Sequence, residues 1–80
     1  MGRYVATFHT HLSALLTSRA LTQGGVAARM APVPRKLSAS CGTCVFYEGE
    51  GPCLERMDAD VEAVYEAAPD GRYRQVMGGQ

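Results

Sequence analysis

Two prolines near the middle of the chain limit what it can fold into. Pro32 and Pro34 carry no backbone N–H, so neither suits the interior of a helix or a central strand of a sheet. The side chains before them alternate and predict a strand over residues 26–33, which must be an edge strand or one that is ending. The small and polar residues that follow predict a loop over residues 34–42.

The rest of the chain divides into short elements on either side of this loop. Leucines at helical spacing follow Thr10, a suitable N-cap, and stop at Gly24-Gly25. A second apolar stripe at helical spacing begins after Gly51-Pro52, a typical helix start. The predicted elements are strands over residues 3–8, 26–33, 43–48 and 72–77, and helices over residues 11–23 and 52–68.

This order, β-α-β-β-α-β, predicts an α+β fold of the ferredoxin-like type, a four-stranded antiparallel sheet with two helices on one face. Its first and third strands are antiparallel central neighbours, so the end of 3–8 should lie beside the start of 43–48. A thioredoxin-like fold is the alternative, but its Cys-x-x-Cys opens a helix, whereas here residues 41–44 lead into a strand.

Length and composition indicate a single domain over residues 1–80. No apolar run approaches the roughly 18 residues that cross a bilayer, and no export signal is evident, so we expect a cytoplasmic protein with no membrane contact. Residues 1–40 carry five cations and no acid, whereas residues 41–80 carry eight acids and three cations. The five cations are too scattered for a nucleic-acid surface, so we expect no nucleic-acid partner.

The chemistry of the chain concentrates at Cys41 and Cys44. Three cysteines in a chain without an export signal predict thiols rather than a disulfide framework. Neighbouring cations can lower a thiol's pKa from about 8.5 toward 7, and nearby N–H and hydroxyl groups stabilise a thiolate. We expect five loop residues to bind an atom or group attached to the Cys41 sulfur through their side chains or backbone: Arg35, Lys36, Ser38, Ser40 and Gly42.

His9 and His11 follow the first strand and should approach Cys41 if the strands pair as expected, with His9 the better candidate to exchange a proton. A zinc site would need four ligands, for which Cys53 and a histidine would have to join the Cys-x-x-Cys pair. A strand and a turn separate Cys53 from Cys44, so we expect no metal. Cys44 could equally be a second reactive thiol or part of the core, because alternation turns it into the sheet.

The stretches 4–8 and 32–42 (Pro-Val-Pro-Arg-Lys-Leu-Ser-Ala-Ser-Cys-Gly) resemble those of the small selenium/sulfur carrier-like family, and the resemblance extends over most of the chain. It implies that Cys41 is the cysteine that carries sulfur or selenium, with Arg35, Ser38 and Ser40 as its motif neighbours. Cys53 lies outside the motif.

The sequence therefore predicts a carrier that holds sulfur or selenium on Cys41 as a persulfide or selenosulfide, with Cys44 able to resolve the adduct. Its partners would be a donor of the cysteine desulfurase type or a selenium-utilising acceptor. Two alternatives stay open: a metal- or redox-binding Cys-x-x-Cys module, and a protein-interaction module with incidental cysteines. A non-catalytic carrier is favoured over an enzyme, no resident cofactor is expected beyond the carried atom, and exposed edge strands could form a homodimer.

Overall fold

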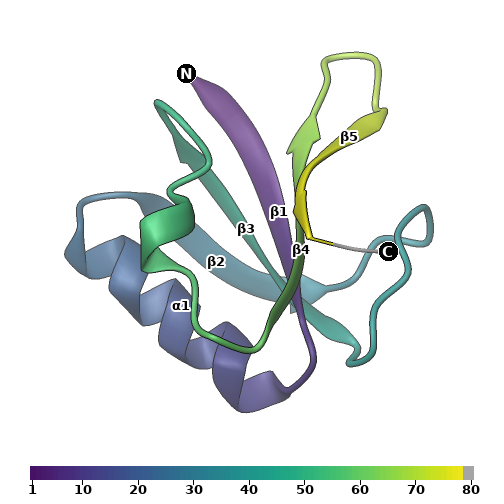
Figure 1. Cartoon of the computed structure of the whole chain (residues 1–80). Coiled ribbons are helices and arrows are strands. Elements are labelled where there is room, and N and C mark those ends of the chain that lie inside the picture. The colour runs from purple at the N-terminus through teal and green to yellow at the C-terminus, as the bar shows by residue number, and fades with distance from the viewer. Residues whose placement is uncertain (79–80) are drawn as a thin grey trace.

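The computed structural model describes residues 1–78 and contains one helix and one five-stranded sheet. The elements are β1 (Gly2–Phe8), α1 (His11–Gln23), β2 (Ala27–Pro32), β3 (Thr43–Gly49), the short 3-10 helix η1 (Leu54–Arg56), β4 (Val61–Ala67) and β5 (Tyr73–Gly78). The strands lie in the order β2-β3-β1-β4-β5, and every neighbouring pair is antiparallel. The predicted α+β class is thus confirmed (Figure 1).

Strand β1 is the centre of the sheet and pairs with β3 on one side and β4 on the other. Its register with β3 places Gly2 opposite Gly49 and Thr7 opposite Cys44. The expectation that the end of the first strand lies beside the start of the third is therefore confirmed. The strand predicted at an edge from its prolines, β2, is an edge strand of the sheet, and β5 is the other.

The second predicted helix, over residues 52–68, is wrong, and with it the four-stranded sheet carrying two helices. Most of that segment is η1 followed by the extended strand β4. The chain leaves helical geometry at Met57, which is extended, and the Asp58 carboxylate then accepts the N–H of Asp60 in a local turn. Because β4 lies between β1 and β5, its apolar residues occupy both faces, and their spacing imitates a helical stripe.

Helix α1 begins and ends where its capping residues predict. The Thr10 side chain accepts the N–H of Ser13 at 3.1 Å. At the other end, Gly25 has a φ of 82°, and the N–H of Val26 reaches back to the carbonyl of Leu21 at 2.9 Å, as in a Schellman motif. A non-glycine residue at position 25 would be strained in this left-handed conformation.

The face of α1 that packs on the sheet includes Leu21 but excludes Leu12 and Leu16. The buried residues are Ser13, Ala14, Thr17 and Leu21, whereas Leu12 and Leu16 are 62% and 44% exposed. The small hydroxyl residues are buried because they bind the segment that precedes β4. With Ser13 and Thr17 bound to Asp58, the side of the helix that carries Leu12 and Leu16 faces away from the sheet.

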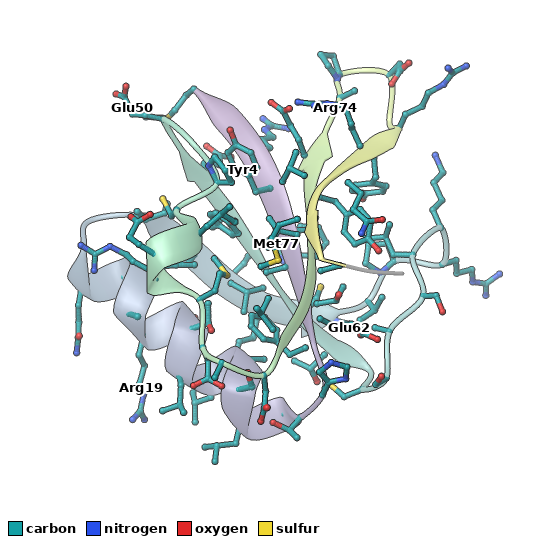
Figure 2. All side chains as sticks on the ribbon, in the orientation of Figure 1. Tyr4, Arg19, Glu50, Glu62, Arg74 and Met77 are labelled. Atoms are coloured by element: carbon teal, nitrogen blue, oxygen red, sulfur yellow. The ribbon has the colours of Figure 1, made fainter. Side chains whose placement is uncertain are left out.

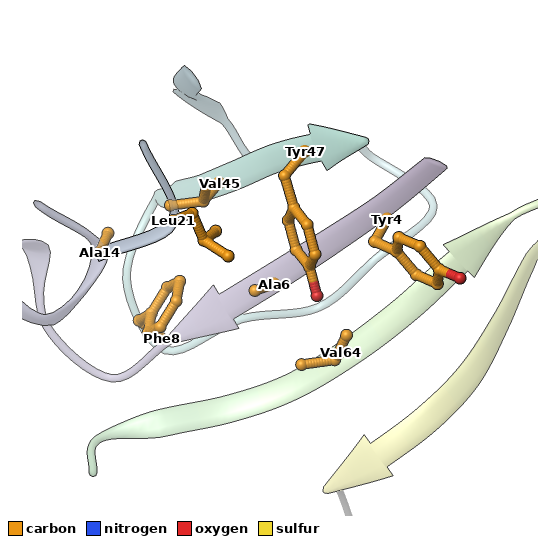
Figure 3. Close-up of a cluster of buried hydrophobic side chains, with 8 residues drawn as sticks. All are labelled: Tyr4, Ala6, Phe8, Ala14, Leu21, Val45, Tyr47 and Val64. Carbon is orange, nitrogen blue, oxygen red and sulfur yellow. The ribbon is translucent and has the colours of Figure 1, made fainter. Parts of the chain in front are cut away.

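The core lies between α1 and the sheet. Side chains of β1, β3 and β4 meet those of the helix there, and the rings of Tyr4 and Tyr47 stack with centroids 5.4 Å apart. Figure 3 shows this cluster, whose members are Tyr4, Ala6, Phe8, Ala14, Leu21, Val45, Tyr47 and Val64. Because these residues use one face of β1 and β3, the alternating residues Thr7 and Cys44 point to the other face.

Asp58 joins the segment before β4 to the helix. The Ser13 hydroxyl donates to its carboxylate at 2.8 Å, and its own N–H donates to Thr17 Oγ1 at 3.0 Å. The Ser13 hydrogen bond, followed by that of the Asp60 N–H, lowers the pKa of the Asp58 carboxyl. The ionised form is therefore favoured in the folded protein.

This contact predicts how acid affects stability. A lowered folded pKa stabilises the protein above the unfolded value, near 3.8, and this contribution is lost as the pH falls through the lowered pKa. Replacing Ser13 with Ala should destabilise the protein near neutral pH and reduce the loss between neutral pH and about pH 3. Urea unfolding across this range measures both effects. Ser18→Ala, on the same helix, is the control and should retain the wild-type pH profile.

Candidate functional site

The long loop between β2 and β3 carries Cys41 and lies on the opposite side of the sheet from α1 (Figure 1). Its two ends are joined by a hydrogen bond from the Val33 N–H to the Gly42 carbonyl at 3.1 Å. Within it, the Leu37 N–H donates to the Pro34 carbonyl at 3.0 Å and forms a tight turn. The predicted loop over residues 34–42 thus has a defined conformation, which presents Cys41 just before β3 begins.

Ser40, the residue before Cys41, is held by the carboxylate of Glu62. The Ser40 N–H donates to Oε1 and its hydroxyl donates to Oε2, both at 3.0 Å. Glu62 is the extra residue at a bulge where the β1–β4 register shifts, since Thr7 lies opposite Ala63 and Phe8 opposite Val61. Figure 2 shows the Glu62 side chain near the lower end of β4, beside the loop.

Both histidines reach the same end of the sheet. His9 Nδ1 lies 3.3 Å from Ser40 Oγ, and His11 Nδ1 lies 3.2 Å from Thr43 Oγ1. The backbone N–H of His9 also donates to the carbonyl of Asp60 at 3.1 Å, which fixes it beside the start of β4. The β1–β3 pairing thus brings His9 into contact with a neighbour of Cys41.

Cys41 is half-buried, and its thiol donates to the carbonyl of Thr43 at 3.4 Å. Its flanking residues Ser40 and Gly42 are both exposed on the loop. Such a thiol can be reached by a reagent or a protein partner while the loop holds its backbone. This combination suits covalent exchange chemistry at sulfur.

Cys44 is in a different environment although it is only three residues away. It is fully buried in β3, and its thiol donates to the carbonyl of Pro32 at 3.6 Å. Burial raises the pKa of the Cys44 thiol to about 11, although the charge of Arg29 partly opposes the shift. A buried, protonated thiol is a poor nucleophile.

Other loop residues that the sequence placed around Cys41 point elsewhere. The Lys36 ammonium donates to the Gly71 carbonyl in the β4–β5 turn at 3.0 Å. Lys36 and Ser38 line a shallow hollow with Tyr65 and Tyr73. Within residues 1–78, neither Lys36 nor the exposed Arg35 forms a hydrogen bond with Cys41.

Cys53 does not join the other two cysteines. It packs against the core on the α1 side of the sheet, and its thiol donates to the Gly51 carbonyl at 3.4 Å. In the part of the chain that the structure describes, no three histidine, cysteine or acidic side chains gather as metal ligands. The same part contains no helix with the length and apolar character to cross a bilayer.

Sequence reasoning missed Glu62 as a site residue. It assigned this position to the polar side of the second helix, far from the loop. A glutamate within a β-branched and aromatic run, Val61 to Tyr65, was the available signal, because such runs are typical of strands. The β-bulge that directs Glu62 to Ser40 depends on pairing with β1 and has no local signature.

A further hollow of about 490 Å³ lies on the sheet beside Phe46 and Tyr73. The guanidinium of Arg29 lies 4.8 Å from the centre of the Phe46 ring. Cys41 is not among the residues that line this hollow. Cys41 thus lies on the loop, apart from this hollow.

The contrast between the two thiols predicts their reactivity. With a pKa of about 11, roughly one in a thousand Cys44 thiols is ionised at about pH 8, and burial also blocks access. Iodoacetamide should therefore modify Cys41 in the folded protein and leave Cys44 unmodified until urea unfolds the chain. Peptide mass spectrometry measures both sites in one sample. Equal modification of Cys44 with and without urea would contradict this assignment.

Comparison with known proteins supplies the family. The chain matches the model of the family described as "Putative Se/S carrier protein-like" over residues 3–66. No curated protein and no solved structure gives a significant match. The matched range runs from β1 into β4 and includes Cys41, His9 and Glu62. Because it covers well over half of the 80 residues, the chain belongs to this Se/S carrier-like family.

Proposed function

We propose that the protein carries sulfur or selenium covalently on Cys41. The observation that supports this most is the placement of Cys41, a half-buried thiol on an ordered loop with an anchored polar neighbour, in a chain of the Se/S carrier-like family. A carrier needs a sulfur atom that two successive partners can reach. An exposed loop provides this access, whereas a deep pocket would restrict it.

The loading step is an exchange at sulfur without net oxidation or reduction. The thiolate of Cys41 attacks the outer sulfur of a persulfide on the donor. A bond forms between Cys41 Sγ and that sulfur, the donor's S–S bond breaks, and the donor cysteine leaves as a thiolate. A base takes the proton of the Cys41 thiol, and the transferred sulfur ends as a Cys41 persulfide. A selenium atom transferred in the same way would give a selenosulfide.

In this proposal Cys44 is a structural residue of the sheet and does not react with the persulfide on Cys41. Its thiol is buried, and its pKa is raised to about 11 by that burial. Attack on a Cys41 persulfide would require the Cys44 thiolate to form inside the sheet. The acceptor protein's own thiolate or selenolate therefore removes the cargo.

The loading step needs a donor that carries a persulfide on its own cysteine, and cysteine desulfurases are enzymes of this type. The exposed cations Arg35 and Lys36 lie on the same loop as Cys41 and favour a partner with an acidic surface around its own cysteine. Their effect would be on the rate of encounter rather than on the chemistry at sulfur.

The wild type and two variants test the proposal. Incubation with a cysteine desulfurase and cysteine should add the mass of sulfur to Cys41 in the wild type and in Cys44→Ala. The same treatment should leave Cys41→Ser unmodified. Peptide mass spectrometry without reductant locates the added atom, and selenocysteine tests selenium in the same assay. Sulfur found on Cys44 or Cys53 but not on Cys41 would refute the proposal.

Cys44→Ala also needs a stability control. Removing a small buried side chain should cost about 1–2 kcal/mol of unfolding free energy, because a cavity replaces it. Urea unfolding checks that the variant is folded under the assay conditions. Retention of sulfur loading on Cys41 in this folded variant would show that Cys44 is not needed for loading.

A further inference from the structure

We infer that Glu62 is a positioning residue that fixes the protonation of His9 beside Cys41. In this network, the Glu62 carboxylate contacts Ser40 Oγ, which in turn contacts His9 Nδ1. The inference rests on the proposed function for its role in sulfur transfer. The arrangement of protons itself does not depend on that function.

The direction of each hydrogen bond follows from the groups involved. An ionised carboxylate can only accept, and Glu62 accepts the N–H of Ser40 on one oxygen and its hydroxyl on the other. The hydroxyl has a single proton, which is thus directed to Glu62. Ser40 Oγ can therefore only accept from His9, so the His9 Nδ1 must carry a proton.

A neutral His9 with its proton on Nδ1 has a free lone pair on Nε2. Within the described residues, no hydrogen bond occupies Nε2, and the His9 side chain is exposed at the Cys41 end of the sheet. Nε2 is then the base that takes the proton when the Cys41 thiol ionises. A carboxylate that holds a histidine in the required tautomer performs the same role in the serine protease triad.

His11 provides an internal comparison. Its Nδ1 contacts the hydroxyl of Thr43 at 3.2 Å. No carboxylate accepts the Thr43 hydroxyl within residues 1–78, so that proton can face His11 and the tautomer is not dictated. Of these two histidines with similar contacts, only His9 has its protonated nitrogen determined by a carboxylate acting through a hydroxyl.

Glu62→Gln should reverse the network without removing it. The amide oxygen can accept the Ser40 N–H, and the amide N–H₂ group then donates to Ser40 Oγ. This frees the Ser40 proton to point at His9 Nδ1, so the histidine proton moves to Nε2. Ser40→Ala removes the connection altogether and is the second variant. Glu66→Gln, on the same strand but paired with Arg74, is the matched control.

The test combines nitrogen NMR with a sulfur-loading assay. Long-range ¹⁵N–¹H spectra at about pH 8, where histidine is mostly neutral, identify the protonated ring nitrogen. We expect Nδ1–H for His9 in the wild type and Glu66→Gln, and Nε2–H in Glu62→Gln. Sulfur loading of Cys41 from a cysteine desulfurase with cysteine should slow about tenfold in Glu62→Gln and Ser40→Ala.

Each outcome decides the inference. An Nε2–H tautomer of His9 in the wild type overturns it, and so does an unchanged tautomer with unchanged loading in folded Glu62→Gln. A reversed tautomer together with slower loading supports it, provided circular dichroism shows the variant to be folded. If the tautomer reverses but the wild type accepts no sulfur, the proton arrangement stands and the carrier function is refuted.

Discussion

The antiparallel pairing of β1 with β3 is the interaction on which the rest of the structure depends. It buries the centre of the sheet and, through its register, places Thr7 opposite Cys44. His9, which follows β1, and the Cys41 loop, which leads into β3, therefore lie at the same end of the sheet. A shift of register by one residue would turn Val45 and Tyr47 out of the core and move Cys44 into it, because side chains alternate along a strand. The same pairing thus determines the core and assembles the candidate site.

The two faces of this sheet are covered in different ways. The apolar cluster and α1 cover one face, whereas the β2–β3 loop crosses part of the other, where its contacts are mostly polar. A polar contact of Ser40 with Glu62, or of Lys36 with Gly71, holds the loop without a large apolar area. Hydrogen bonds of this exposed kind each contribute modestly, about 1 kcal/mol. The loop is therefore held mainly by a few polar contacts of modest strength rather than by a large buried apolar area.

Local signals predicted the first half of the fold well. The Thr10 cap, the Gly24-Gly25 stop and the two prolines each act through their own backbone, so their positions can be identified without knowing the tertiary structure. The second half depended on burial. Residues 61–67 form a strand that pairs with β1 and β5, although the spacing of their apolar residues also continues a helical stripe. The candidate site shows the same contrast. Cys41, Ser40 and His9 could be proposed from the sequence and the expected strand order, whereas the position of Glu62 depends on a β-bulge that the sequence does not reveal.

The Cys-x-x-Cys spacing is a weaker guide to this protein than the strand boundary that falls within it. Cys41 precedes β3 and is accessible, whereas Cys44 is the second residue of β3 and is buried on both sides by paired strands. Two thiols at this spacing act together in redox or metal chemistry only if both can ionise and turn toward a shared atom. Here one of them is fixed in the ladder between β2 and β1, and its pKa is raised by burial. The proposed chemistry therefore uses the single sulfur of Cys41, whose neighbour Ser40 contacts His9 from the end of β1 and Glu62 from the start of β4.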